Sequence, residues 1–379
     1  MSASSGARRD ATIGWLYRRV LKPIFFRFDP ESTHRRMIRV GQLLGRSAVT
    51  RRLTQSMFGF RNSMLRTSVA GLSFENPVGL SAGFDKEGEL LEITPSVGFG
   101  FMEIGSITGS PSTGNPKPRL WRLPKSRGLV VHYGLNSSGS LAVASRLYGQ
   151  PTTMPLFMSI AKANHPDFDP EEAGIADYVR AANNLRGVGA VRVINISCPN
   201  TTGGEPFVDP TRLDHLLGAL GEMMQARPTF IKLPVDCTDR QYDDIIDVAG
   251  RHRLTGFICT NLSKRRDNPA ILDDHVPPHG GISGKVVEAA SDRVLRYVYA
   301  KTEGRMPLIG VGGIFSAEDA YKKIRAGASL VALITGMVYQ GPQLIGEINR
   351  GLVRLLQRDG FQHIAEAVGT DGFQGAGHY

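Results

Sequence analysis

The sequence alternates short apolar runs with helix-like stretches, and this alternation limits the chain to a few folds. Each run is rich in Val, Ile, Leu or Phe, as expected for parallel strands that are buried on both faces. The runs span 78–82, 101–107, 155–160, 190–196, 229–233, 256–260, 307–311 and 330–334. Helix-like stretches separate most of them, as at 170–184, 211–225, 240–250, 285–300 and 317–325.

Eight strands that alternate with helices predict an α/β fold of the (β/α)8 TIM barrel type. A doubly wound open sheet is the alternative, but no G-x-G-x-x-G follows the first strand. We assign the barrel to residues 61–365 and expect a loose tail at 366–379. The long connection at 109–154 is expected to carry function, as loops of that length usually do.

Residues 1–60 are strongly basic, whereas the rest of the chain is close to neutral. They hold twelve Lys and Arg against three Asp and Glu, in a chain whose net charge is +10. A near-neutral body lacks the basic face that nucleic acids require, so we expect no nucleic-acid partner. We expect residues 1–10 to be disordered and residues 11–60 to form amphipathic helices.

Two short helices are expected within 11–60. Apolar residues recur at helical spacing over 13–24, and Pro23 is expected to bend or end that helix. A second helix is expected to start at a Ser32 or Thr33 cap and to bury Met37, Val40, Leu43 and Leu44. Aromatic residues among arginines fit either a membrane-surface element or a segment docked on the body. We expect neither a membrane span nor a secretory leader.

Polar residues and glycines follow the predicted strands, where a barrel carries its active site. Gly312 and Gly313, after the seventh strand, fit either a phosphate-binding turn or an ordinary turn between strand and helix. Lys86 and Lys232 close the first and fifth strands, and a buried lysine is rare without an anion. The combined set suits a large polar ligand that carries a phosphate.

Asn195 and Asn200 flank Cys198 just after the fourth strand. Asparagine both donates and accepts hydrogen bonds, which suits a planar heterocycle with carbonyl and N–H groups. A free thiol has a pKa of about 8.5 that a nearby cation lowers, so Cys198 is a candidate base or nucleophile. The alternative is a buried structural cysteine, which we expect for Cys237 and Cys259. No H-E-x-x-H or C-x-x-C spacing occurs, so we expect no metal site.

Several long segments, in order along the chain, resemble the dihydroorotate dehydrogenase family. They are NPVGLSAGFDKEGE (76–89), EIGSITGSPSTGNPKPRLWRL (103–123), NISCPNTTGGEP (195–206), GGISGK (280–285) and IGVGGIFSAEDAYKKIRAGASLV (309–331). The N-terminal LYRRVLKPIFFRFDPESTHR (16–35) extends the resemblance over almost the whole chain. It is strongest to the quinone-dependent, membrane-associated class 2 of the family.

This resemblance implies an FMN enzyme that oxidises dihydroorotate to orotate in de novo pyrimidine biosynthesis. A quinone would accept the electrons between the two N-terminal helices, which would hold the protein peripherally at the cytoplasmic side of a membrane. Cys198 is expected to be the catalytic base. The substrate is expected to contact Lys86, Asn136, Asn200 and Asn261. FMN is expected to contact Ala82, Gly83, Ser106, Ser159, Asn195, Lys232, Thr260, Gly284, Gly313, Thr335 and Gly336.

Five positions depart from the family pattern. Cys198 stands where class 2 enzymes usually place serine, although class 1 enzymes use cysteine. Val131 replaces a substrate-binding asparagine, Leu135 a phenylalanine, Leu262 a threonine, and Ser159 a flavin-contacting asparagine. A lost partner for a buried polar group costs about 1–3 kcal/mol. A second hypothesis is therefore a related flavoenzyme acting on another ring, and a third is a non-enzymatic membrane or anion-binding barrel.

Overall fold

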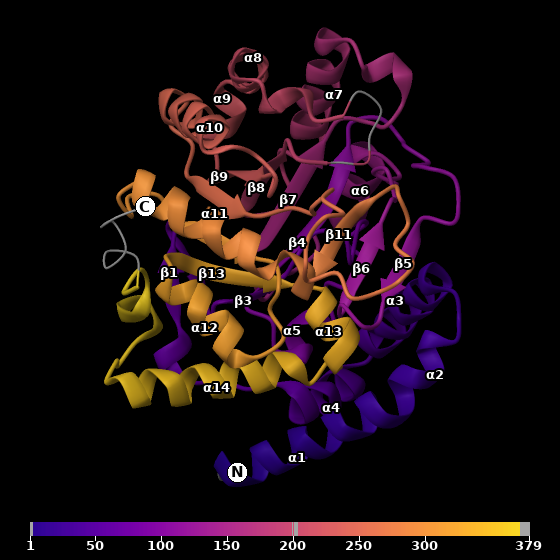
Figure 1. Ribbon diagram of the computed structural model, residues 1–379, viewed down its shortest axis with the longest axis vertical. Coiled ribbons are helices and arrows are strands. Elements are labelled where there is room, and N and C mark those ends of the chain that lie inside the picture. Colours follow the sequence, from indigo (N-terminus) through magenta and orange to yellow (C-terminus); the bar gives the residue numbers. More distant parts are fainter. Residues whose placement is uncertain (1–2, 199, 201–203, 372–379) are drawn as a thin grey trace.

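A closed barrel of parallel strands forms the centre of the computed structural model, which describes residues 3–198, 200 and 204–371 (Figure 1). The barrel strands are β3 (Val78–Leu80), β4 (Phe101–Thr108), β7 (Leu156–Ala161), β8 (Val191–Asn195), β9 (Thr229–Leu233), β10 (Gly256–Cys259), β12 (Leu308–Val311) and β13 (Ala328–Leu333). They follow one another around the barrel in chain order, and β13 pairs with β3 to close it. The predicted (β/α)8 barrel is confirmed, and each predicted strand is present.

Helices follow the barrel strands, and most of them pack around the outside of the barrel (Figure 1). They are α5 (Thr94–Val97), α6 (Ser140–Leu147), α7 (Glu171–Asn184), α8 (Pro210–Leu220), α9 (Glu222–Gln225), α10 (Asp239–Arg251), α11 (Glu288–Lys301), α12 (Ala317–Arg325), α13 (Thr335–Gln340) and α14 (Leu344–Asp359). Short 3-10 turns are η2 (Ser63–Leu65), η3 (Pro166–Phe168), η4 (Pro206–Val208), η5 (Lys285–Val287) and η6 (Ile364–Ala367). The single helix expected at 211–225 is divided at Gly221, whose φ of 42° is not helical.

Apolar side chains fill the barrel at the amino ends of its strands. Phe101, Phe157 and Phe230 belong to one buried cluster, and the ring centroids of the first two lie 4.9 Å apart. The hairpin of β1 (Thr67–Val69) and β2 (Leu72–Phe74) adds Phe74 to this cluster. A larger cluster packs the strands against the outer helices. Because the amino end is filled, the barrel offers open space at the carboxyl ends of its strands.

The long connection at 109–154 folds into structure of its own. It contributes β5 (Leu120–Leu123) and β6 (Gly128–Val131) to an antiparallel sheet, in which β6 also pairs with β11 (Gly281–Gly284). The sheet order is β11-β6-β5. Two segments that are far apart in the sequence therefore lie side by side, and both contribute to the cavity described below.

The N-terminal helical segment lies beside the barrel, next to α13 and α14 (Figure 1). It consists of α1 (Ala3–Leu16), the π-helical η1 (Tyr17–Leu21), α2 (Lys22–Phe26), α3 (Pro30–Arg46) and α4 (Ala48–Phe58). Asp10 pairs with Arg350 of α14, and the Tyr17 hydroxyl donates to the Val338 carbonyl at 2.8 Å. Across the described parts of the chain, no helix combines the length and apolar character that crossing a membrane requires.

Helix boundaries in this segment differ from the sequence prediction. Helix α1 already begins at Ala3, so residues 3–10 are helical rather than disordered. Pro23 does not end the first helix, because the preceding turn widens and the Lys22 N–H bonds the Tyr17 carbonyl. Helix α3 starts at Pro30, since Asp29 is the cap and its carboxylate accepts from the Ser32 N–H at 2.8 Å.

Two further expectations about the ends of the chain need correction. Val40 and Leu43 are 46% and 63% exposed rather than buried, because α3 turns only one side toward the barrel. At the other end, residues 366–371 pack on the barrel: the Gly369 N–H donates to the Ile324 carbonyl, and Asp371 pairs with Arg325. The rest of the expected tail, 372–379, lies outside the described residues, as do residues 1–2.

Candidate active site

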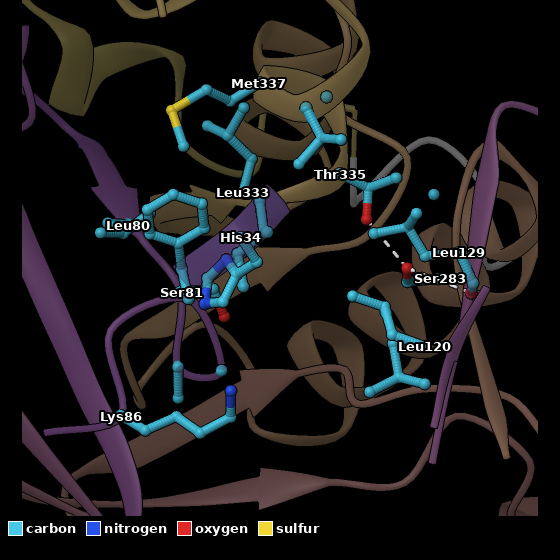
Figure 2. Close-up of a pocket in the computed structure, with 18 of the residues that line it drawn as sticks. His34, Leu80, Ser81, Lys86, Leu120, Leu129, Ser283, Leu333, Thr335 and Met337 are labelled. Carbon is cyan, nitrogen blue, oxygen red and sulfur yellow. Dashed lines mark hydrogen bonds between the residues drawn. The ribbon is translucent and has the colours of Figure 1, made fainter. Parts of the chain in front are cut away.

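A cavity of about 480 Å³ lies at the carboxyl ends of the barrel strands. Figure 2 shows Lys86, with His34 from α3, on one side of the cavity, and Ser283 and Thr335, with Leu129 from β6, on the other. The cavity continues beneath the N-terminal helices, where its lining includes Phe25, Met37, Leu44 and Phe58. It therefore joins a polar barrel mouth to an apolar space under the helical segment.

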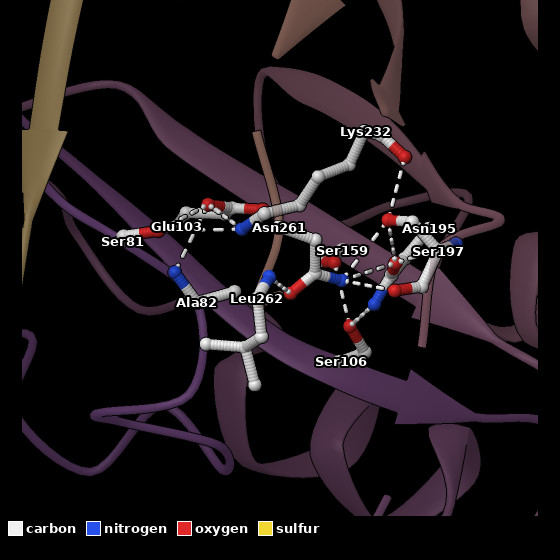
Figure 3. Close-up of polar contacts among 10 residues, drawn as sticks. All are labelled: Ser81, Ala82, Glu103, Ser106, Ser159, Asn195, Ser197, Lys232, Asn261 and Leu262. Atoms are coloured by element: carbon white, nitrogen blue, oxygen red, sulfur yellow. Dashed lines mark hydrogen bonds and ion pairs between the residues drawn. The ribbon is translucent and has the colours of Figure 1, made fainter. Parts of the chain in front are cut away.

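A buried ion pair crosses the barrel mouth between β4 and β9. The Lys232 Nζ lies 3.1 Å from Oε2 and 3.3 Å from Oε1 of Glu103, and both side chains are almost fully buried. Glu103 Oε2 also accepts from the Ala82 N–H at 2.9 Å and the Ser81 hydroxyl at 3.2 Å (Figure 3). Buried charges persist only when they are paired and hydrogen-bonded, so this pair fixes Lys232 and the backbone at Ala82.

A network of amides and hydroxyls lies beside this ion pair (Figure 3). The Asn195 amide donates to the Ser106 hydroxyl at 2.7 Å, and Ser106 is 2.8 Å from the Ser159 hydroxyl. The side-chain Oδ1 of Asn195 accepts from the Asn261 side-chain amide at 3.2 Å. The Ser197 hydroxyl, which donates to the Lys232 carbonyl at 2.8 Å, links the network to β9. Each amide is held in one orientation toward the cavity, as recognition of a planar polar ring requires.

Glycines and hydroxyls form a second polar corner, at the turns after β11, β12 and β13. Gly284 and Gly313 have φ of 88° and 76°. A Cβ atom at Gly313 would lie 2.4 Å from Glu288 Cβ, and one at Gly284 would lie 2.3 Å from the Arg127 carbonyl oxygen. The hydroxyls of Ser283 and Thr335 are 2.8 Å apart. Such a corner of bare backbone and hydroxyl donors suits a phosphate.

Cys198 lines the cavity just after β8, as a half-buried cysteine that forms no disulfide. Burial raises the pKa of this thiol to about 11, although the Asn200 backbone N–H and the cations of Lys264 and Lys162 oppose the rise. The neighbouring cations do lower the pKa of Cys198, as expected, but desolvation raises it by more. In this arrangement the thiol is protonated at neutral pH, and its basic form becomes common only in alkaline solution.

Asn136 and Asn200, which were predicted to bind the substrate, also line the cavity. The Asn200 amide donates to the Val131 carbonyl at 2.8 Å, and the Asn136 amide donates to the Thr113 carbonyl at 2.9 Å. Apolar side chains share this lining with them. These are Val131, Leu135 and Leu262. The cavity consequently presents both amide and apolar edges to a ring bound beside Cys198.

Lys86 extends into the cavity (Figure 2). Its Nζ lies 3.9 Å from the centre of the Tyr133 ring. Burial, and next the charge of Arg119, lower the pKa of Lys86 to about 8. Burial also lowers the pKa of His34 to about 3, so His34 is neutral in this wall. Lys86 is thus a cation that an anionic ligand would stabilise, close to the expected substrate position.

The structure brings together nearly all the residues predicted from the sequence. Each predicted site residue lines the cavity except Ser159, which is fully buried and supports Ser106 from behind. Sequence reasoning missed Glu103, Ser197 and Ser283. A signal existed for Glu103, because a charge inside a strand that is buried on both faces requires a partner.

Comparisons with known proteins point in one direction. The family described as "Dihydroorotate dehydrogenase" matches residues 64–356. A protein named "Dihydroorotate dehydrogenase (quinone)" from a Synechococcus strain is 38% identical over 360 residues, covering 89% of this chain and 94% of its own. A protein of the same name from Acaryochloris marina is 38% identical over 374 residues, covering 93% and 99%.

Solved structures give the same result. A crystal structure of DHODH from Eimeria tenella in complex with ferulenol superposes with a TM-score of 0.79 at 28% identity, and covers 91% of this chain and 96% of that one. The ligand-free type of the Eimeria tenella protein gives a TM-score of 0.74 at 29% identity, covering 88% and 98%. The similarity therefore extends to the N-terminal helices as well as the barrel.

Proposed function

The chain belongs to the dihydroorotate dehydrogenase family, and from this premise we propose that it oxidises (S)-dihydroorotate to orotate with a quinone as electron acceptor, in pyrimidine biosynthesis. The observation that carries the proposal is the single cavity that joins a polar barrel mouth containing Cys198 and Lys86 to the apolar space under the helices. One part suits a polar ring, and the other suits a hydrophobic acceptor. Family membership leaves a non-enzymatic barrel without support.

The residues present fit FMN as the cofactor. Gly284 and Gly313, with the Thr335 hydroxyl, would hold the phosphate, because a Cβ at either glycine would collide with its neighbours. Asn195, Lys232 and Thr260 would hold the ring system, for which their fixed amide, ammonium and hydroxyl groups are suitable donors. Ala82, Gly83, Ser106 and Gly336 complete this lining. Bound FMN would supply the two-electron redox chemistry that the reaction requires.

The remaining polar residues would act on the substrate. Lys86 would hold the substrate carboxylate by charge, while Asn136, Asn200 and Asn261 would hydrogen-bond its ring. The Cys198 thiolate would remove the proton from the ring carbon next to the one that gives up hydride. Because burial raises the pKa of Cys198, this step favours alkaline solution.

A related ring substrate is the second candidate, and the apolar wall favours it. Val131 and Leu262 line the cavity where an amide and a hydroxyl are expected in this family, and Leu135 is a further apolar side chain of the lining. Each buried polar group of dihydroorotate that loses a partner there would weaken binding by about 1–3 kcal/mol. A ring with one less polar edge would avoid this loss.

The helical segment supports quinone access and peripheral membrane binding. Trp15, Leu43, Val49 and Leu53 are each more than half exposed. Arginines are interspersed with these apolar side chains along α1 to α4. An apolar surface mixed with cations suits the boundary between acyl chains and anionic headgroups. We place this surface at the cytoplasmic side of the membrane.

One assay decides between these functions. Purified protein should show the absorbance of bound FMN and should form orotate from dihydroorotate faster with a quinone than with fumarate. Bound FMN without orotate formation would favour the second substrate, and a fumarate preference would reject the quinone assignment. Absence of FMN would reject the flavoenzyme. Sedimentation with anionic vesicles, compared with neutral ones, tests the membrane surface.

A further inference from the structure

A buried carboxylate in the first turn of α3 reaches out of the helical segment to the barrel. Glu31 Oε1 lies 3.0 Å from Arg119 Nη2, and Oε2 lies 3.2 Å from Nε, so the two side chains meet as a fork. Both are over 90% buried. A buried pair gains little net stability unless further hydrogen bonds complete it. The other contacts of Arg119 therefore indicate what the pair accomplishes.

Arg119 fixes the loop that precedes β5. Its Nη1 donates to the Thr113 carbonyl at 2.8 Å and to the Asn115 carbonyl at 3.0 Å. The Thr113 carbonyl is also the acceptor for the Asn136 amide at 2.9 Å. Arg119 thus holds, on one side, the helical segment through Glu31 and, on the other, the backbone that orients Asn136.

The contacts continue from this loop to the turn beside Cys198. The Asn115 side-chain amide donates to the Asn200 carbonyl at 3.0 Å, and the Asn115 N–H donates to the Tyr133 carbonyl at 2.9 Å. The Asn200 amide in turn donates to the Val131 carbonyl at 2.8 Å. A continuous series of hydrogen bonds therefore connects Glu31 to the residue two positions after Cys198.

The charges of Glu31 and Arg119 also act on Lys86. The Tyr133 ring contacts both cations, with its centre 3.9 Å from Lys86 Nζ and 5.1 Å from the Arg119 guanidinium carbon. Arg119 lowers the pKa of Lys86 and Glu31 raises it. The charged and titratable groups that face Lys86 are Asp85 and Glu87 on its own loop, Glu31 and His34 on α3, and Arg119 and Tyr133 on the connection. The Asp85 carboxylate already accepts from the backbone N–H groups of 87, 89 and 90.

We propose that Glu31 is a positioning residue for the substrate side of the active site. With Arg119 it holds the loop that orients Asn136 and Asn200, and it offsets the charge of Arg119 beside Lys86. The helical segment then serves the oxidation of substrate and not only the delivery of electrons to an acceptor. This inference rests on the proposed function, because it assumes that the loop faces dihydroorotate.

Hydrogen–deuterium exchange of the full-length, FMN-loaded protein tests the loop directly. In Glu31→Gln, the N–H groups of Asn115 and His132, which bond the Tyr133 and Arg119 carbonyls, should exchange at least about tenfold faster, as local opening becomes easier. Lys117→Gln is the matched control, since Lys117 lies 3.6 Å from the same carboxylate but is 55% exposed. Asp292→Asn breaks a comparably buried pair with Lys323, away from this loop, and controls for general loss of stability. Both controls should leave the two amides unchanged.

Rapid kinetics test the charge. Reduction of the enzyme by dihydroorotate without an acceptor should require about tenfold more substrate in Glu31→Gln, because each tenfold change reflects only about 1.4 kcal/mol of lost interaction. Reoxidation by a soluble quinone should be unchanged. The pH at which kcat/KM stops rising should also fall, because the uncompensated Arg119 lowers the pKa of Lys86 further. Arg119→Lys, which retains the charge but not the fork, should loosen the loop without this pH shift.

The outcomes separate the two proposals. Unchanged exchange at Asn115 and His132 in both Glu31→Gln and Arg119→Lys would overturn the role of Glu31, whatever the substrate is. Slower reoxidation by quinone with unchanged reduction by dihydroorotate would also overturn it, since Glu31 would then serve the acceptor. A wild-type protein that dihydroorotate does not reduce would instead reject the proposed function, and the exchange experiment would still decide the role of Glu31.

Discussion

Replacing Glu103 with glutamine leaves Lys232 as an uncompensated cation at the barrel mouth. Glutamine retains an oxygen for the Ala82 N–H, so the variant removes mainly charge. At the observed 3.1 Å, the Coulomb attraction is roughly 5 kcal/mol at an effective dielectric constant near 20. Removal of one member of a buried pair typically costs about 3–5 kcal/mol. For a domain of this size, a shift of about 2 °C per kcal/mol gives a loss of roughly 6–10 °C in Tm.

Thermal unfolding followed by circular dichroism measures this loss. Tm should be measured at several FMN concentrations, because a ligand that binds only the native state raises Tm by itself. The double variant Glu103→Gln with Lys232→Met removes both charges and should recover at least half of the lost stability. A Tm for Glu103→Gln within about 2 °C of the wild type, or a double variant no more stable than the single one, would refute the reasoning.

Three other perturbations follow from the site. With the pKa of Cys198 raised to about 11 and that of Lys86 lowered to about 8, kcat/KM should rise about tenfold per pH unit up to pH 8, and then level off as loss of the Lys86 proton offsets thiol ionisation. The rate of orotate formation, measured across pH, tests this profile. Cys198→Ser should react more slowly and have a higher pH optimum. Full activity of Cys198→Ala at every pH would remove Cys198 from the mechanism. Gly313→Ala brings a Cβ within 2.4 Å of Glu288 at a positive φ, so FMN content after dialysis should fall severalfold, and an unchanged content would place the phosphate elsewhere. Leu262→Thr restores a hydroxyl to the apolar wall and should raise kcat/KM for dihydroorotate about tenfold if that ring is the substrate; a decrease would favour the less polar ring.

The barrel was predictable because local patterns determine its parts. The run at 229–233 and the helix at 317–325 match β9 and α12 residue for residue, since a doubly buried strand and an amphipathic helix each have a distinct periodicity. The cap at Asp29 was missed because Ser32 and Thr33 have similar capping preferences, and only the backbone decides among them. The sheet of β5, β6 and β11 was missed for another reason. Its pairing joins 128–131 to 281–284, and no local pattern encodes so distant a partner.

The candidate site was predictable only where it uses strand ends. Cys198 and its flanking asparagines could be located because parallel strands of a barrel direct their carboxyl ends to one face. Glu31 and Arg119 could not, because their pairing depends on how the helical segment docks on the barrel. Burial also reversed the sign expected for the pKa of Cys198. Charge neighbours can be guessed from sequence, whereas desolvation depends on the whole fold.

Closure of the barrel between β13 and β3 has a consequence for synthesis of the chain. Val78 of β3 pairs with Val331 of β13. The edge of β3 that faces β13 therefore stays unpaired while most of the protein is still being made. At a synthesis rate of about 5–20 residues per second, the time between synthesis of Val78 and of Val331 is roughly 10–50 s. An unpaired apolar edge invites association with other chains. We therefore expect truncated chains that end before β13 to aggregate and to bind no flavin, and the nascent protein to depend on chaperones until its last barrel strand emerges.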